Sequence, residues 1–257
     1  MNKKITLQFT GFTLAITLLT WGTAAVLGQL GITFDKHPWL WILFILGGLS
    51  PTYVSYIVLR RNGEVAGFKE WLKNVFHFKA KIRHYLLVLL FVILFFGIQI
   101  AVSGMTEMQP LYMFFLMLPV VFVGGGLEEA GWRYILQPQL DRAYGFIASS
   151  VITGIIWWAW HIPLFFIPGT GQHDFIDFWM YAVHILGMTF FYGVIIRVSG
   201  RAGVWLSVLA HTLMNAAFNT FGFYETWMGT IVTFVVMLGI SMILVLVHKK
   251  KQASCAA

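Results

Sequence analysis

The chain has 257 residues, of which 59% are hydrophobic and only 11% are charged, and its formal net charge is +7. Soluble domains carry about 25% charged residues, so this composition excludes an ordinary water-exposed surface and indicates a membrane protein. The positive charge does not indicate a nucleic-acid-binding protein, because such a protein presents a soluble basic face and this sequence offers none.

Eight segments along the chain are apolar enough to cross a bilayer, which takes about 20 mainly apolar residues. They are 5–27, 38–59, 84–104, 111–137, 145–167, 176–197, 202–221 and 227–247. The first is longer than the apolar region of about 7–15 residues in a signal peptide, so we expect it to be retained. We predict an all-α polytopic membrane protein with about eight transmembrane helices, forming a single transmembrane domain over 1–257.

The one long connection, at 60–83, lies between the second and third of these segments. It mixes apolar side chains such as Trp71 and Val75 with basic ones such as Lys69 and Lys73. This pattern predicts an amphipathic helix over about 64–81 that lies at the membrane surface. Its basic residues hint that an internal cavity would be reached from the cytosol.

The positions of lysine and arginine set the predicted orientation, because basic residues concentrate in cytoplasmic connections. With the N-terminus inside, all 17 of these residues except Lys36 and Arg133 lie on the cytoplasmic side. An even number of spans then leaves both termini in the cytoplasm. We therefore expect a multi-pass protein of the cell membrane, with the bacterial cytoplasmic membrane as its location.

Three of the predicted spans contain ionisable residues together with other strongly polar groups. Such groups cost several kcal/mol in hydrocarbon unless they are paired or hydrated, and they therefore usually mark function. The fourth span contains Gly-Gly-Gly-Leu-Glu-Glu-Ala-Gly-Trp-Arg over 124–133, the fifth contains Trp157 and His161, and the seventh contains His211 and Asn215.

The spacing within these segments predicts how the side chains are arranged. Glu129 and Arg133 are four residues apart and can form an ion pair on one helix, which leaves the neighbouring Glu128 free to face a cavity. His211 and Asn215 are also four apart and project from one helix face. With His161 from a third helix, we expect Glu128, His161, His211 and Asn215 to converge in a wet pocket between helices.

Two kinds of chemistry suit this set of residues. A buried carboxylate can act as a general base, a neighbouring histidine can help to hold the water, and a second histidine with an asparagine can donate to the oxyanion. This is hydrolysis without a covalent intermediate. Alternatively, Glu128, His161 and His211 are three ligands of a catalytic zinc ion with one position open for water, although their spacing is not that of H-E-x-x-H peptidases.

Structural interpretations compete with these functional ones. A single histidine inside a membrane is often a hydrogen-bonding group between helices, and we assign such a role to His184. The glycines at 124–126 indicate close helix packing, since no Lys-Ser/Thr follows as in a phosphate-binding loop. The Glu129–Arg133 pair is expected to support the site rather than to react.

These segments together resemble the CPBP family of CAAX-processing and bacteriocin-processing intramembrane endopeptidases, also called Abi proteins. The family pattern is E-E-x-x-x-R, then an aromatic residue with a histidine four later, then H-x-x-x-N. It matches Glu128-Glu129 with Arg133, Trp157 with His161, and His211 with Asn215. Trp157 stands where the family usually has phenylalanine, and the matched region is roughly 120–220.

The resemblance implies a CAAX-type intramembrane endopeptidase with its catalytic core at about 111–222, and it leaves the use of metal open. We expect the glutamate type without a cofactor, with a zinc metalloprotease as the alternative. Glu128 and His161 would activate water, His211 and Asn215 would stabilise the oxyanion, and Glu129, Arg133 and Trp157 would support them. The implied partners are a hydrophobic or lipidated peptide or protein substrate and the lipid bilayer, with no nucleic acid. The alternatives are a non-catalytic protein for bacteriocin self-immunity and a proton-coupled transporter that uses the same ionisable groups.

Overall fold

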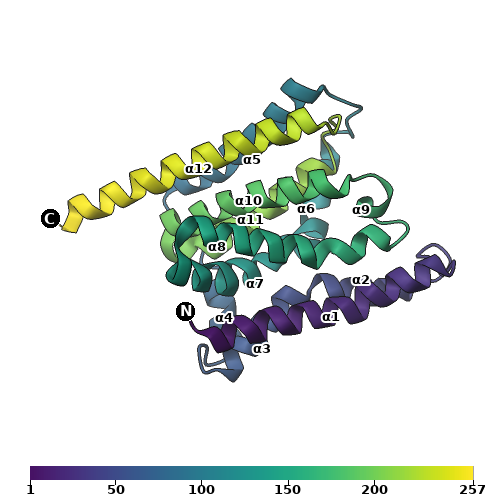
Figure 1. The fold of residues 1–257 in the computed structure, drawn as a ribbon, viewed down its shortest axis with the longest axis horizontal. Coiled ribbons are helices and arrows are strands. Elements are labelled where there is room, and N and C mark those ends of the chain that lie inside the picture. The colour runs from purple at the N-terminus through teal and green to yellow at the C-terminus, as the bar shows by residue number, and fades with distance from the viewer. Residues whose placement is uncertain (257) are drawn as a thin grey trace.

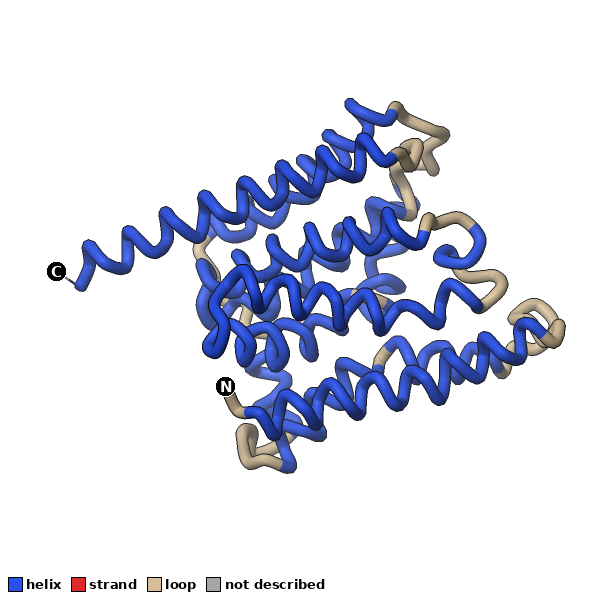
Figure 2. Tube along the Cα trace, viewed as in Figure 1, coloured by secondary structure: helices blue, strands red, loops and turns tan. Residues whose placement is uncertain are grey.

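The computed structural model describes residues 1–256, and these residues form helices and loops with no β-strand among them. Figures 1 and 2 show a bundle in which most helices run nearly parallel or antiparallel to one another, with the connecting loops gathered at its two ends. The predicted all-α class is confirmed.

Twelve α-helices occur in the described part of the chain, and short 3-10 or π turns join some of them. Their bounds are α1 (Lys3–Gln29), α2 (Leu40–Gly48), α3 (Ser50–Arg61), α4 (Phe68–Val75), α5 (Ile82–Ser103), α6 (Tyr112–Gly124), α7 (Glu129–Gly131), α8 (Gln137–His161), α9 (Gly171–Asp174), α10 (Phe178–Ser199), α11 (Gly203–Phe218) and α12 (Trp227–Ala256). A 3-10 turn, η1 (Gly126–Glu128), precedes α7, and a π turn, η2 (Trp132–Leu136), follows it.

Five helical stretches of the described chain are long and apolar enough to span a membrane, and α2 with α3, bent by 53°, makes a sixth candidate. Two of the stretches, 112–166 and 178–218, each contain two of the predicted spans. A straight helix of 55 residues would be about 80 Å long, far beyond the hydrocarbon core of about 30 Å. The backbone leaves the helical conformation at Gly145 (φ 77°) and Gly200 (φ 56°), which glycine adopts without steric cost.

Helix α10 lies at the centre of the bundle and packs against α8, α11 and α12. Half of its residues are fully buried, including Phe191 and Tyr192. At the two outer faces, α1 packs on α2 and α3, and α12 packs on α5 (Figure 1). These outer helices expose large apolar side chains such as Leu19 and Ile93. Exposed apolar surface of this kind suits contact with lipid, so the polytopic membrane class is supported.

The two ends of the bundle carry opposite charge. Both termini lie at one end (Figure 1), together with the connections that hold every lysine and arginine except Lys36 and Arg133. The other end is formed by the loops 30–39, 104–111, 167–177 and 219–226, and the second and fourth of these are joined by hydrogen bonds such as Thr106 N–H to Gly222 O. These loops hold five of the ten acidic residues: Asp35, Glu107, Asp174, Asp177 and Glu225. We call the two ends the basic end and the acidic end.

The connection 60–83 forms the short helix α4 within the predicted range 64–81. Trp71 and Val75 are buried against the rest of the protein, and the Trp71 indole N–H donates to Ser55 Oγ at 3.1 Å. Asn74 donates to the Tyr134 hydroxyl at 2.8 Å. The apolar side of α4 therefore packs on protein, and its placement at a membrane surface stays a prediction.

Candidate active site

One cavity of about 630 Å³ is lined by Glu128, His161, His211 and Asn215. Glu128 ends η1, His161 ends α8, and the other two residues lie one turn apart on α11. Glu128, His161 and His211 are buried, with exposed fractions of 4%, 6% and 5%. The structure thus brings together the four side chains that the sequence analysis singled out, from three separate segments.

One carboxylate oxygen of Glu128 accepts hydrogen bonds from the protein, and the other has no partner among the described residues. Its Oε2 accepts hydrogen bonds from the indole N–H groups of Trp157, at 3.0 Å, and Trp132, at 3.4 Å. Its Oε1 has no hydrogen-bond partner among the described residues. Both donors are neutral, so they orient the carboxylate without cancelling its charge. The free oxygen is available to a water molecule or a substrate in the cavity.

The glycines before Glu128 let this segment lie directly against α11. A Cβ atom on Gly125 would collide with the Asn215 amide nitrogen and would lie 3.3 Å from His211 Nε2. A Cβ on Gly126 would collide with the Thr212 hydroxyl. A Cβ on Gly124 would meet nothing within 4 Å. Close packing therefore explains two of the three glycines, as the sequence indicates.

Glu129 is completely buried and joins two of the predicted groups. Its Oε2 lies 2.6 Å from Arg133 Nε, which confirms the predicted ion pair, and its Oε1 lies 2.9 Å from His211 Nδ1. Arg133 also donates from Nη1 to Gln137 Oε1 at 2.7 Å. Because the Glu129 carboxylate binds Nδ1, the ring of His211 has a fixed orientation, and its Nε2 stays free on the side of the cavity.

Trp157 contacts most of the site. Besides its bond to Glu128, its backbone oxygen lies 2.8 Å from His161 Nδ1. A carbonyl can only accept, so Nδ1 carries the hydrogen and Nε2 of a neutral His161 ring is an acceptor. The indole centroid lies 5.8 Å from that of His161 and 5.4 Å from that of His211, and the Arg133 guanidinium lies 5.0 Å from it.

Three residues of the site were not identified from the sequence. Trp132 is the second donor to Glu128, and Gln137 holds Arg133 in turn. Tyr192 stacks on the other side of that guanidinium, at 4.8 Å. The spacing of four between Glu128 and Trp132, and between Arg133 and Gln137, was available as a signal. Nothing in the sequence around Tyr192 indicates its position.

The cavity extends from these residues to the acidic end of the bundle. There it is lined by Gln172 and Phe175 from the α9 region, by Phe223 and Glu225 from the loop after α11, and by His184. Glu225 accepts a hydrogen bond from the Asp177 backbone N–H at 3.1 Å, and burial raises the pKa of its carboxyl group. His184 Nε2 lies 3.2 Å from the Thr230 hydroxyl, a contact between helices of the kind expected from the sequence. The same residue also borders the cavity. The basic segment 60–83 does not line this cavity, so it gives no evidence for access from the cytosol.

A catalytic zinc ion needs three protein ligands that converge on one point. Glu128, His161 and His211 line the same cavity, but within residues 1–256 no group of three or more His, Cys, Asp or Glu side chains is arranged to hold a metal ion. Both imidazoles are held through Nδ1, by Trp157 O and Glu129, which is also how metal-bound histidines are oriented. The placement of the three side chains, and not the hydrogen bonding of the rings, is what does not give a ready ligand set.

Comparisons with known proteins relate the chain to CAAX prenyl proteases. A family model described as type II CAAX prenyl endopeptidase Rce1-like matches residues 109–217, a range that contains all four cavity residues named above. The chain is also similar to CAAX prenyl protease 2 of Methanococcus maripaludis. The two are 24% identical over 232 residues, which cover 79% of this chain and 80% of that protein.

Proposed function

We propose that the chain is a CAAX-type membrane endopeptidase of the CPBP family and that it hydrolyses a peptide bond in a hydrophobic or lipidated membrane substrate with water that Glu128 activates. The observation that carries this proposal is the free Oε1 of a buried Glu128 in a cavity that it shares with two imidazoles and an amide. The mainly apolar lining of that cavity, which includes Trp21, Phe44 and Ile185, suits a hydrophobic peptide.

The proposed reaction has two steps. Glu128 takes a proton from water, the water oxygen bonds to the substrate carbonyl carbon, and the carbonyl oxygen becomes an oxyanion. The tetrahedral intermediate then collapses: the carbonyl re-forms, the C–N bond breaks, and the proton on Glu128 passes to the leaving nitrogen. No bond forms between enzyme and substrate, so a single carboxylate serves as base and then as acid.

The two histidines are proposed to have different roles because their Nδ1 partners differ. His161 faces a backbone carbonyl, so its Nε2 can accept a hydrogen bond from the attacking water. His211 faces the Glu129 carboxylate, which is the arrangement that stabilises an imidazolium in histidine–carboxylate catalytic pairs. His211 Nε2 and the Asn215 amide would then donate to the oxyanion, where the loss of one donor typically costs about 100-fold to 1,000-fold in rate.

The reaction is proposed to need no metal ion. The support is that no three His, Cys, Asp or Glu side chains within residues 1–256 are placed to hold a metal ion together. The competing zinc mechanism would use Nε2 of both rings and the free oxygen of Glu128, so it predicts dependence on a bound metal.

We also propose eight membrane spans with both termini in the cytoplasm of a bacterial cell. The support is the charge difference between the two ends of the bundle, since basic residues favour the cytoplasmic side. With this orientation the cavity opens at the acidic end, away from the cytosol. The substrate would then be a peptide in or beyond the outer leaflet.

Separate Glu128→Gln and His161→Ala variants test the proposal. The purified proteins are assayed for cleavage of a hydrophobic peptide library in liposomes, beside a Glu107→Gln control at the acidic end but outside the cavity lining. The proposal expects cleavage by the wild type and the control and strong loss in both cavity variants. Full activity in both cavity variants would overturn it.

A further inference from the structure

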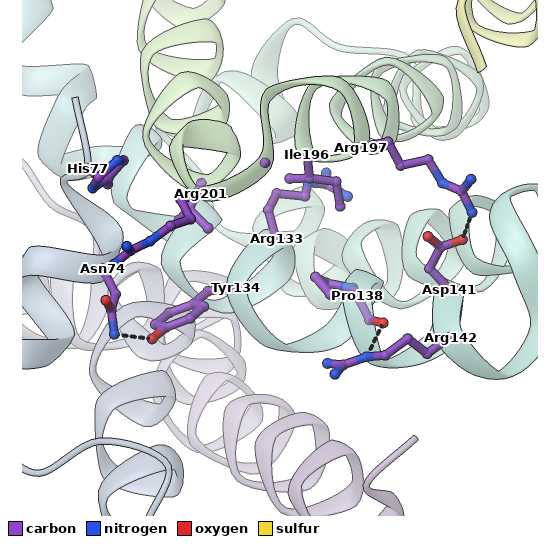
Figure 3. A pocket seen from close by; sticks show the side chains of 12 residues that line it. Asn74, His77, Arg133, Tyr134, Pro138, Asp141, Arg142, Ile196, Arg197 and Arg201 are labelled. Carbon is purple, nitrogen blue, oxygen red and sulfur yellow. Dashed lines mark hydrogen bonds and ion pairs between the residues drawn. The ribbon is translucent and has the colours of Figure 1, made fainter. Parts of the chain in front are cut away.

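A second cavity, of about 510 Å³, lies at the basic end of the bundle (Figure 3). Four arginines border it, Arg133, Arg142, Arg197 and Arg201, together with His77, and the one acidic residue in its lining is Asp141. It is separate from the candidate active site, and the two cavities share no lining residue. We call it the basic cavity.

Part of the positive charge in the basic cavity is unbalanced. Arg197 forms an ion pair with Asp141, and Arg142 donates to the Pro138 backbone oxygen at 3.2 Å. Arg201 makes no hydrogen bond or ion pair with the described residues, and its side chain extends toward Asn74 (Figure 3). An anion entering the cavity would therefore meet a guanidinium that no carboxylate neutralises.

Buried donors without partners are a second, independent sign of a missing ligand. Arg133 is fully buried, yet its Nη2 has no hydrogen-bond partner among the described residues. The Nε of Arg197 is also buried without a partner in that part of the chain. Buried polar groups in native proteins are almost always hydrogen-bonded, so each exception calls for an explanation such as an absent ion.

We propose that the basic cavity binds a phosphate group, carried by a lipid headgroup or by a soluble phosphate compound. Arginine matches the geometry of phosphate oxygens and can bind them through two parallel N–H groups. The cavity is large enough for a headgroup, and Ile196, Val204 and the Tyr134 ring supply apolar contact beside the arginines. In the proposed orientation this end faces the cytoplasmic leaflet, whose anionic lipids attract basic residues.

Binding is tested with purified protein in a neutral detergent, titrated with short-chain phosphatidylglycerol, short-chain phosphatidylcholine or inorganic phosphate. Native mass spectrometry counts the bound molecules for the wild type, Arg201→Gln and Arg61→Gln, an exposed arginine at the same end outside the cavity lining. We expect phosphatidylglycerol to bind, with affinity reduced at least about fivefold in Arg201→Gln, unchanged in Arg61→Gln and partly restored in Arg201→Lys.

Each outcome decides the proposal. Equal binding of inorganic phosphate would support a soluble phosphate compound as the source, and preference for phosphatidylglycerol would support a headgroup. No binding of any probe, or equal loss in Arg201→Gln and Arg61→Gln, would overturn the site. Because binding is measured without hydrolysis, it can succeed or fail independently of the proposed peptidase activity.

Discussion

The indole nitrogen of Trp157 donates a 3.0 Å hydrogen bond to Glu128 Oε2. The backbone oxygen of the same residue accepts a hydrogen bond from His161 Nδ1 at 2.8 Å. One residue of α8 therefore fixes both the proposed base and the histidine that is proposed to help it. The contact with His161 uses the backbone carbonyl, which any residue at position 157 would supply one helical turn away, whereas the bond to Glu128 needs the indole N–H of tryptophan.

The first prediction concerns this hydrogen bond. Trp157→Phe removes the indole donor but keeps an aromatic ring, and Trp132 remains as the second donor to Glu128. A hydrogen bond to a charged group contributes roughly 1.5 kcal/mol, which corresponds to about a 10-fold decrease in kcat. Steady-state kinetics on a cleaved peptide measures the change.

Trp158→Phe is the matched control for that experiment. Trp158 lies next in the same helix, and its buried indole nitrogen has no hydrogen-bond partner among the described residues. Its substitution should leave kcat nearly unchanged, because it removes no hydrogen bond to a described residue. Equal effects of the two substitutions would show that the Trp157–Glu128 bond does not orient the base.

The second prediction concerns the close approach of the glycine segment to α11. Gly125→Ala places a methyl group against the Asn215 amide and His211 Nε2, so we expect one of these side chains to move. A displacement of about 1 Å in a catalytic group can cost about 100-fold in rate. Gly124→Ala, which meets nothing within 4 Å, should keep near-normal activity. The comparison uses kcat together with circular dichroism to confirm that both variants fold.

The third prediction concerns metal. Activity should survive prolonged treatment with a strong chelator, and elemental analysis of the purified protein should find less than one zinc per chain. Loss of activity on chelation, followed by recovery with zinc, would instead favour Glu128, His161 and His211 as ligands.

The fourth prediction concerns the side on which the cavity opens. In a Cys255→Ser background, which removes the chain's single cysteine, Phe175→Cys places a thiol at the acidic end and Arg61→Cys places one at the basic end. Both native side chains are exposed. A membrane-impermeant maleimide added to intact cells should label Phe175→Cys alone. Labelling of Arg61→Cys alone would reverse the orientation and make the substrate cytosolic.

Much of the site could be predicted from local spacing. Pairs separated by four residues, such as Glu129 with Arg133, share one turn of helix whatever the surroundings are. The hydropathy pattern likewise identified the apolar segments because burial and lipid contact both require them. The choice of Glu128 over Glu129 as the group that faces the cavity also followed from this reasoning, since Arg133 can pair with only one of them in good geometry.

Contacts between distant segments could not be predicted. The bond from Glu129 to His211 joins residues 82 positions apart, and it depends on how two helices are rotated about their own axes. The direction of the cavity depends on which loops close over it, and apolar loop residues such as Phe175 carry no signal for that. Gly145 and Gly200 have positive φ and break two long helical stretches. Hydropathy indicates that stretches of this length must be divided, but it does not show at which residue.

The source of the oxygen in the new carboxyl group tests the role of water most directly. A single turnover is run in water enriched in ¹⁸O, with enzyme in excess over peptide, and the product and the tryptic peptide that contains Glu128 are then weighed by mass spectrometry. Direct attack by water predicts one ¹⁸O in the product carboxyl group and none in Glu128. Unlabelled product with ¹⁸O in Glu128 would mean that the carboxylate itself attacks the substrate, and it would contradict the account.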